Sequence, residues 1–204
     1  MNKVIHAAFR RDIRRFLDAL DHFPDGDQAR ARQLGMAWAN FDRQLTQHHQ
    51  GEHEVVWPAL EAVGVDRSLI GEMDEEHERL GEALSSSRQA MAALDRSASA
   101  SDAAAARSAI AALQTVAVEH MEHEEAELES IYLTKRNDPA MKAMERQFRR
   151  TSLPEAGTFL VWLSDGASSE ERAALRQNVP PPVIAIIGGL FGHRYRRDVA
   201  PAWR

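Results

Sequence analysis

The chain of 204 residues contains no cysteine. Disulfide frameworks, thiolate catalysis, zinc fingers built on cysteine and cysteine-ligated clusters are therefore excluded. Any metal site in this chain has to use histidine, aspartate, glutamate or methionine side chains. The absence of one residue type thus narrows the chemistry before any motif is considered.

The sequence also lacks a long apolar run. Residues 1–16 contain no continuous apolar core before a small-residue cleavage site, so we expect neither a signal peptide nor a transmembrane segment, and we predict a cytoplasmic location. The apolar run at residues 183–191 is far shorter than the roughly 20 residues that cross a bilayer. It ends at His193-Arg194-Tyr195-Arg196-Arg197, which is either a solvated helix end or a site for an acidic partner or anionic group.

Excess positive charge is missing as well. The formal net charge is -6, which would repel a phosphate backbone, so we expect no nucleic-acid partner. Hydrophobic residues make up 44% of the chain and charged residues 27%, proportions that are typical of a globular protein. A chain of this length is long enough to bury one sizeable core.

Helical periodicity is the main signal in the first two thirds of the chain. Apolar residues recur every three or four positions in four stretches, separated by short breakers of the kind that join antiparallel helices. We therefore predict an all-α fold, with an up-down-up-down four-helix bundle over residues 1–135. Pro58 should kink or restart the second helix, and Ser101 or Asp102 should cap the fourth.

Residues 136–204 differ in character from the bundle. Asp138-Pro139 fits a cap followed by a proline at the first helical position, and Ser168 to Glu171 fits a capping box. Prolines at 154 and 180–182 divide the segment into short elements. We predict a C-terminal helical extension that packs on or beside the bundle.

Histidine occupies the apolar stripe of each of the four predicted bundle helices. His48 and Glu52, for example, continue a stripe of apolar residues in steps of three and four, so both should point into the core. With a rise of about 1.5 Å per residue, the four histidines fall at about the same level of the bundle. The side chains that this spacing places in the core are His6, His48, Glu52, His77, His120 and Glu124.

A cation explains such a layer best, because unpaired buried charge costs several kcal/mol. Imidazole suits iron, zinc, copper or nickel, and a glutamate on each of two facing helices can bridge two ions about 3.5 to 4 Å apart. Two iron ions fit best, and zinc is an alternative. A small molecule such as dioxygen, peroxide or nitric oxide could bind at an open coordination position. The expected pocket wall is Phe9, Trp38, Phe41, Leu45 and Leu80, although core packing alone also explains Trp38 and Phe41.

Several neighbouring residues have more than one interpretation. His49 and His53 lie four apart on the same helix, so a shift of register would make them ligands; otherwise they are solvated or support the ligands. His123 presents the same ambiguity, and Met73 is interpreted as core packing or as a residue beside the ligands. The glutamates around His77 and Glu124, including Glu76 and Glu125, are predicted to form a charged outer face.

The histidine motifs resemble those of the hemerythrin-like HHE cation-binding domains over about residues 1–135. The matching pieces are His6-x-x-Phe9-Arg10-Arg11-Asp12, His48-His49-x-x-Glu52-His53-x-x-Val56-Trp57-Pro58, Met73-x-x-Glu76-His77 and His120-x-x-x-Glu124. The resemblance implies a non-haem di-iron site, oxo- or hydroxo-bridged. In that site the four histidines of the core layer would be terminal ligands, and Glu52 and Glu124 would be bridges.

One position departs from the pattern of the oxygen carriers that the motifs resemble. Those proteins place two histidines four apart on the third helix, whereas Met73 occupies the earlier position here. Four histidines and two glutamates are closer to the ligand set of bacterial iron-centre repair proteins, but the cysteine-bearing segment of those proteins is absent. The resemblance therefore favours peroxide or nitric oxide chemistry, redox sensing or iron handling over reversible oxygen carriage.

Three classes of function follow from these observations. The first is a di-iron protein that binds, senses or turns over a small oxidant; if it is an enzyme, it is an oxidoreductase acting on peroxide or nitric oxide. The second is a haem-binding or haem-degrading bundle with a His/Glu axial pair. The third is a scaffold or regulatory module that docks a partner through the extension, and a homodimer is among the assemblies that the sequence allows.

Overall fold

The computed structural model describes residues 1–204 and contains helices but no strand, which confirms the all-α prediction. The four long helices are α1 (Asn2–Asp21), α2 (Gln28–Gly51), α4 (Arg67–Ser97) and α5 (Ala100–Lys135). The shorter helices are α3 (Trp57–Ala62), α6 (Pro139–Phe148), α7 (Leu153–Ser164), α8 (Ser169–Asn178) and α9 (Pro181–Phe191). Two π-helical turns, η1 (Glu52–Val56) and η2 (Tyr195–Val199), and a 3-10 turn, η3 (Ala200–Trp203), complete the chain. None of these helices combines the length and the apolar character that crossing a membrane requires.

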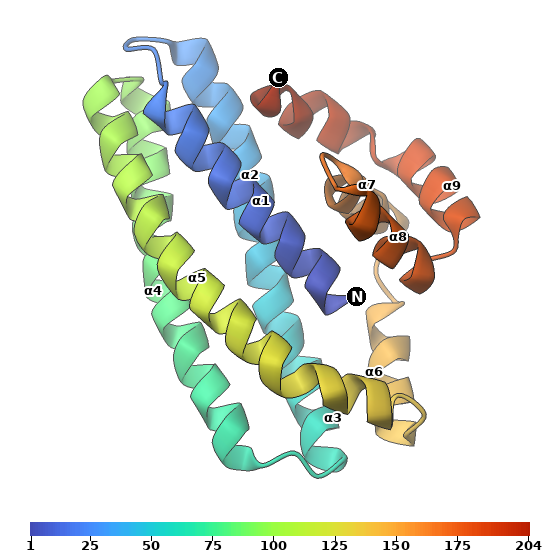
Figure 1. Ribbon diagram of the computed structural model, residues 1–204. Helices are drawn as coiled ribbons and strands as arrows, with labels where there is room; N and C mark the ends of the chain where they lie inside the picture. Colours follow the sequence, from blue (N-terminus) through green and yellow to red (C-terminus); the bar gives the residue numbers. More distant parts are fainter.

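The long helices lie side by side, and each runs opposite to the long helix before it (Figure 1). α5 packs between α1 and α4, and α2 packs against α4. Their apolar stripes form one large buried cluster toward the end where α1 turns into α2, with Phe9, Phe16 and Phe41 in it. A second, smaller cluster around Trp57 and Met73 fills the other end.

The histidine layer separates these two apolar clusters. On α2 and η1, His48 and Glu52 lie between Leu45 of the large cluster and Val56 of the small one. On α4, His77 lies between Met73 and Leu80, and on α5 His120 and Glu124 precede Leu128 of the small cluster. The bundle therefore holds a polar layer with apolar packing above and below it, which keeps bulk water away from that layer.

Local signals set most helix ends. Asp138 caps α6, with Pro139 at its start, and Ser168 and Glu171 form the expected capping box of α8. The predicted cap of the fourth helix was wrong: Ser99 caps α5 by accepting a hydrogen bond from the backbone N–H of Asp102, so α5 begins before Ser101. The helix starts earlier because alanine at position 100 is a strong helix former.

Pro58 has the predicted effect on the second helix. Proline cannot donate a backbone hydrogen bond, and its ring clashes with the carbonyl four residues earlier. The regular α2 ends at Gly51, a π-helical turn follows, and α3 restarts at Trp57 with Pro58 in its first turn. Such π turns occur frequently at functional sites, and this one begins at Glu52.

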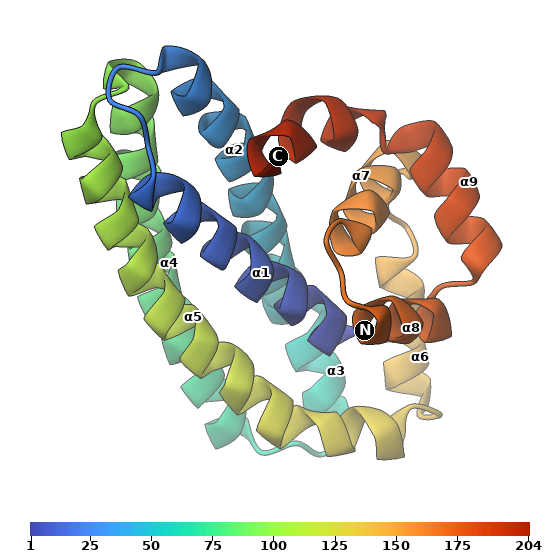
Figure 2. The ribbon, with the colours of Figure 1, turned by 45° about the horizontal axis from the view of Figure 1, so that its top comes forward.

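The C-terminal helices cover one side of the bundle, beside α1 and α2 (Figure 2). Trp162 of α7 is fully buried, and its Nε1 donates a hydrogen bond of 2.7 Å to Asp12 Oδ2 on α1. Arg11 donates to the Trp162 carbonyl oxygen, and the Tyr195 hydroxyl donates to Asp165. The contacts of Asp12 and Arg11 with Trp162 fix the position of the segment against α1.

Helices α7 and α9 approach so closely that only glycine fits at the crossing. A Cβ atom at Gly157 would lie 2.8 Å from the carbonyl carbon of Phe191 and 2.9 Å from the carbonyl oxygen of Ile187, both on the backbone of α9. Gly157→Ala should therefore lower the free energy of unfolding by about 1 to 3 kcal/mol in denaturant titrations. Gly189→Ala is the matched control, because a Cβ there meets nothing within 4 Å, and it should be neutral or stabilising. Equal stability of the two variants would contradict this close packing.

Candidate metal centre

Four imidazoles from four different helices converge in two pairs. Nε2 of His6 on α1 lies 3.2 Å from Nε2 of His48 on α2, and the two residues are buried or nearly so. Nε2 of His77 on α4 lies 3.1 Å from Nε2 of His120 on α5. One N–H···N hydrogen bond between neutral imidazoles accounts for this spacing in a metal-free pair. The same spacing suits two ligands of one ion, which lie about this far apart when each bond is roughly 2.1 Å.

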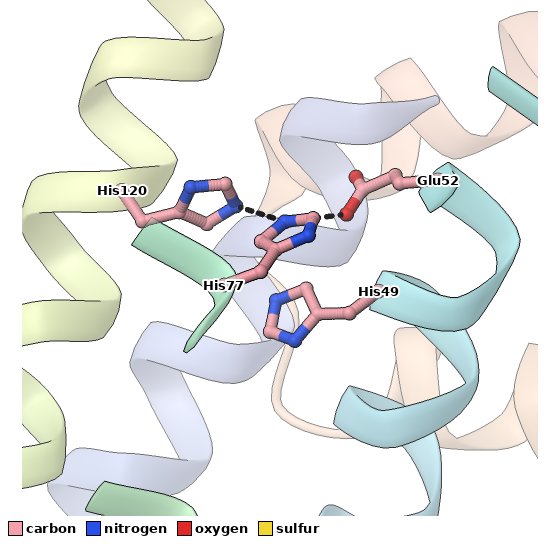
Figure 3. Close-up of side chains that lie close together, drawn as sticks. All are labelled: His49, Glu52, His77 and His120. Carbon is pink, nitrogen blue, oxygen red and sulfur yellow. Dashed lines mark hydrogen bonds and ion pairs between the residues drawn. The ribbon is translucent and has the colours of Figure 1, made fainter. Parts of the chain in front are cut away.

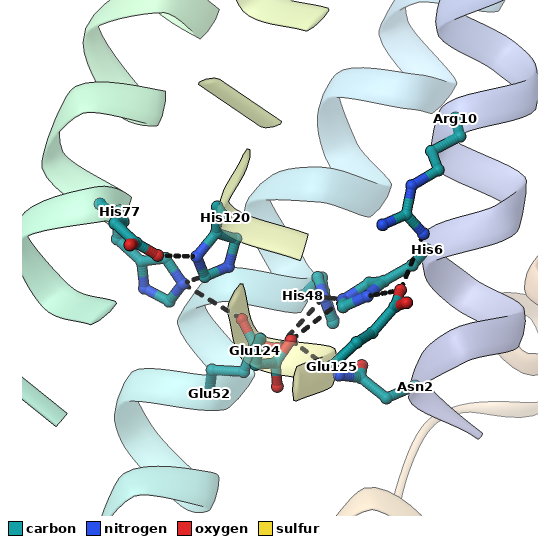
Figure 4. Close-up of polar contacts among 10 residues, drawn as sticks. Asn2, His6, Arg10, His48, Glu52, His77, His120, Glu124 and Glu125 are labelled. Atoms are coloured by element: carbon teal, nitrogen blue, oxygen red, sulfur yellow. Dashed lines mark hydrogen bonds and ion pairs between the residues drawn. The ribbon is translucent and has the colours of Figure 1, made fainter. Parts of the chain in front are cut away.

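Glu52 connects the two pairs of imidazoles. Its Oε1 lies 3.1 Å from Nε2 of His48, and its Oε2 lies 3.4 Å from Nε2 of His77. The side chain is buried, and Oε2 has no hydrogen-bond donor. One carboxylate therefore faces both pairs with different oxygens, which is the arrangement required of a carboxylate that bridges two ions (Figure 4).

Glu124 also faces the first pair of imidazoles. It is buried one turn after His120 on α5, and its Oε2 lies 3.1 Å from Nε2 of His6. The same oxygen accepts a hydrogen bond of 2.7 Å from Asn2, while Oε1 is buried without a partner. The two unpartnered carboxylate oxygens, one on Glu52 and one on Glu124, fit a cation, because a buried oxygen without a donor is otherwise costly.

Carboxylates outside the layer hold the outer nitrogens of two histidines. Glu125 lies 2.8 Å from Nδ1 of His6 and also accepts from Arg10. Glu76 lies 2.9 Å from Nδ1 of His120 and 2.8 Å from Nδ1 of His123. A histidine that donates from Nδ1 to a carboxylate keeps the lone pair on Nε2, which is the form that binds a metal.

Glu76 and Glu125 were predicted to form a charged outer face, and this was wrong for both. Each lies one position away from a residue of the core layer, so its carboxylate reaches around the helix to an imidazole of a neighbouring helix. Asn2 was missed altogether. Glu76 precedes His77 and Glu125 follows Glu124 in the sequence. A carboxylate next to a buried histidine or glutamate, on the side that faces the next helix, is the signal that could have identified both residues.

His49 joins the second pair of imidazoles (Figure 3). Its ring centroid lies 4.4 Å from that of His77 and 5.5 Å from that of His120. Two groups of side chains could each hold a metal ion, and in each group the ligand atoms lie within 4.8 Å of one another. The groups are His6, His48, Glu52 and Glu124, and His49, Glu52, His77 and His120, so Glu52 belongs to both.

The other residues singled out from the sequence lie at different depths. His53 is exposed, with Nδ1 3.4 Å from Asp74, and does not face the layer. Met73 is fully buried in the small apolar cluster, and the ring of Phe9 lies 5.4 Å from that of His48. Phe41, Leu45 and Leu80 are buried in the large cluster. Trp38 lies ten residues before His48, about 15 Å along α2, and borders a surface groove between α2 and α4.

Residues 3–132 match the family described as Hemerythrin HHE cation binding domain. The chain belongs to this family. The matched range begins at the second residue of α1, extends through α4 and most of α5, and includes every side chain of both donor groups. No curated protein and no solved structure was found to match the chain. The HHE family therefore supports cation binding by this bundle, and the helices after α5 lie outside the matched range.

Burial keeps the imidazoles of His48, His49 and His77 in the neutral form that binds metals. Desolvation lowers the pKa of His48 and of His49 well below the ordinary value, and the neighbouring imidazoles lower both pKa values further. Burial and the proximity of His120 lower the pKa of His77 to about 4. Burial and the charge of Glu124 raise the pKa of Glu52. Neutral imidazole binds a metal without first losing a proton, so the lowered pKa values of His48, His49 and His77 favour metal binding at neutral pH, whereas Glu52 binds a metal only in its ionised form.

The lowered pKa of His77 gives the metal-free HHE domain an acid-sensitive stability. The unfolded chain binds a proton at His77 near pH 6.5, whereas the folded chain binds it only near pH 4. Stability is therefore complete above pH 6.5 and decreases as the pH falls toward 4. Protonation of His77 alone should lower the free energy of unfolding by about 2 kcal/mol as the pH falls from 7 to 5. Denaturant titrations of metal-free wild type and His77→Gln should give a smaller loss in the variant, and equal losses would contradict the assignment.

Proposed function

We propose that this HHE domain holds two iron ions, oxo- or hydroxo-bridged, and uses them to bind, sense or turn over dioxygen, peroxide or nitric oxide. His6 and His48 would bind one ion, and His77 and His120 the other. Glu52 and Glu124 would bridge the two ions. His49, from α2, would be a further ligand of the second ion.

The position of Glu52 is the observation that carries this proposal. Its two oxygens face different imidazole pairs at 3.1 and 3.4 Å, and one of them has no hydrogen-bond donor. A single ion would need only one of these pairs. Two donor groups that share one carboxylate therefore favour a dinuclear centre over a mononuclear one, and imidazole together with carboxylate suits iron.

The surrounding residues would prepare the centre for a small ligand. Bound iron would supply electron transfer to or from an oxidant at an open coordination position. Glu125 and Glu76 would hold the proton on Nδ1 of His6 and His120, which leaves Nε2 of each ring free to bind a metal. Arg10 would hold Glu125 in place. The apolar clusters on both sides of the layer would exclude water and large reductants, so that only small molecules react there.

Anaerobic reconstitution with Fe(II), followed by addition of hydrogen peroxide, nitric oxide or air, tests the proposal. We expect about two irons per chain and, after oxidation, absorption bands of an oxo-bridged iron pair. His77→Ala should lose most of this spectrum, while the exposed His53→Ala should keep it. A Soret band in the purified protein would replace the proposal with haem binding. An iron-loaded protein whose spectrum is unchanged by all three reagents would contradict oxidant chemistry.

A further inference from the structure

Helix α9 presents an apolar face that no other part of the chain covers. Val183, Ile186 and Leu190 recur at helical spacing, and their exposed fractions are 42%, 57% and 67%. Most apolar residues of the chain are buried or scattered singly on the surface, which needs no explanation. A row of three on one short helix is different, because contiguous exposed apolar surface marks an interaction site.

The opposite face of the same helix is firmly held. Gly188 and Gly192 of the α9 region pack against Val161 of α7, and Gly157 of α7 packs against the α9 backbone. Pro181 and Pro182 begin the helix, and both residues are exposed. The outward row is therefore displayed by a fixed helix at the outer edge of the molecule, away from the bundle (Figure 2).

Positive charge accompanies the apolar row. Residues 172–197 contain five arginines and no aspartate or glutamate, although the whole chain carries a net charge of -6. Arg194 is exposed and lies three residues after the end of α9, and Arg197, in η2, pairs with Asp198. Arg196 and Arg204 border a pocket of about 370 Å³ between α7 and α9. An acidic protein thus places a group of arginines near its most exposed apolar helix.

We propose that α9 and the basic turn after it dock on an anionic lipid bilayer. A helix that lies in the interface buries a row of apolar side chains in the lipid boundary, while arginines beside it bind anionic headgroups. Three large apolar side chains on an outer edge suit a flat surface better than a groove in a protein. A second copy of the chain fits less well, because its α9 region carries the same positive charge.

Sedimentation with vesicles tests the proposal on the full chain. Vesicles of neutral phosphatidylcholine and vesicles with about one third phosphatidylglycerol are compared at low and high salt. We expect binding to the anionic vesicles only, and weaker binding at high salt. Ile186→Ser combined with Leu190→Ser should weaken binding about tenfold or more, and Arg194→Glu should do the same while Arg194→Lys should not.

Leu133→Ser is the matched control, since Leu133 is 65% exposed but lies on α5, outside the α9 surface. It should bind like the wild type. Circular dichroism and iron content, both unchanged in all variants, would establish that the variants are folded. Absence of binding to anionic vesicles, or binding that the α9 variants leave intact, would overturn the proposal. A dimer in sedimentation velocity that Ile186→Ser and Leu190→Ser abolish, without vesicle binding, would assign the surface to self-association instead.

Discussion

Glu52→Gln is expected to remove both metal ions from the protein, while the same change at Glu54 leaves the metal content unaltered. Glu52 belongs to both donor groups, with one oxygen toward His48 and the other toward His77. An amide cannot supply two anionic oxygens, so each of the two proposed ions would lose a ligand at once. Glu54 lies on the same π-helical turn but is exposed, which makes Glu54→Gln a control for charge and position.

Metal analysis of the two purified variants after reconstitution with Fe(II) measures this effect. Loss of a supporting residue typically lowers metal affinity 10- to 100-fold, and loss of a shared ligand should exceed that range. We expect about two irons per chain in Glu54→Gln and close to none in Glu52→Gln after gel filtration. One tightly bound iron per chain in Glu52→Gln would mean that Glu52 binds a single ion. Two tightly bound irons per chain would mean that Glu52 is not a ligand.

The same Glu52→Gln protein is expected to be more stable than the wild type when both are free of metal. In the unfolded chain Glu52 has its ordinary pKa of 4.5, so it is ionised at pH 7.5. The folded chain must either bury that charge or take up a proton, because burial raises the pKa of Glu52. Glutamine avoids both costs, and we expect a gain of about 2 kcal/mol or more in the free energy of unfolding.

The pH dependence of that gain identifies its cause. Because the pKa of Glu52 is raised in the folded chain, its contribution to the stability of the wild type is complete below pH 4.5. That contribution is lost as the pH rises through the pKa of Glu52 in the folded chain. The advantage of Glu52→Gln should therefore shrink as the pH falls from 7.5 toward 4.5. Urea titrations of both metal-free proteins at several pH values give this curve. A metal-free wild type that is the more stable protein at pH 7.5 would show that Glu52 is not strained without a cation.

Much of this arrangement could be predicted from the sequence because its determinants are local. A buried stripe repeats every three or four residues, so the positions of His48 and Glu52 within their stripe already indicate that both point inward. Proline at position 58 predicts where α2 is interrupted, and Asp138-Pro139 predicts where α6 begins. The four long helices and the common level of their histidines follow from such signals together with the rise per residue.

The remaining features depend on contacts between helices, which periodicity does not contain. Glu76 and Glu125 were interpreted as solvated, yet each carboxylate reaches an imidazole of another helix. Asn2 binds Glu124 across 122 positions of the chain. Likewise, the two Glu52 oxygens face imidazoles of two different helices, which the local sequence does not specify.

X-ray absorption at the iron edge of the reconstituted protein tests the central claim most directly. If Glu52 and Glu124 join two ions, the spectrum will contain an iron scatterer at about 3.5 to 4 Å or closer, together with shells of nitrogen and oxygen and none of sulfur. Glu54→Gln should give the same spectrum. Iron that binds at one ion per chain, with no second iron in the scattering, would contradict the dinuclear centre.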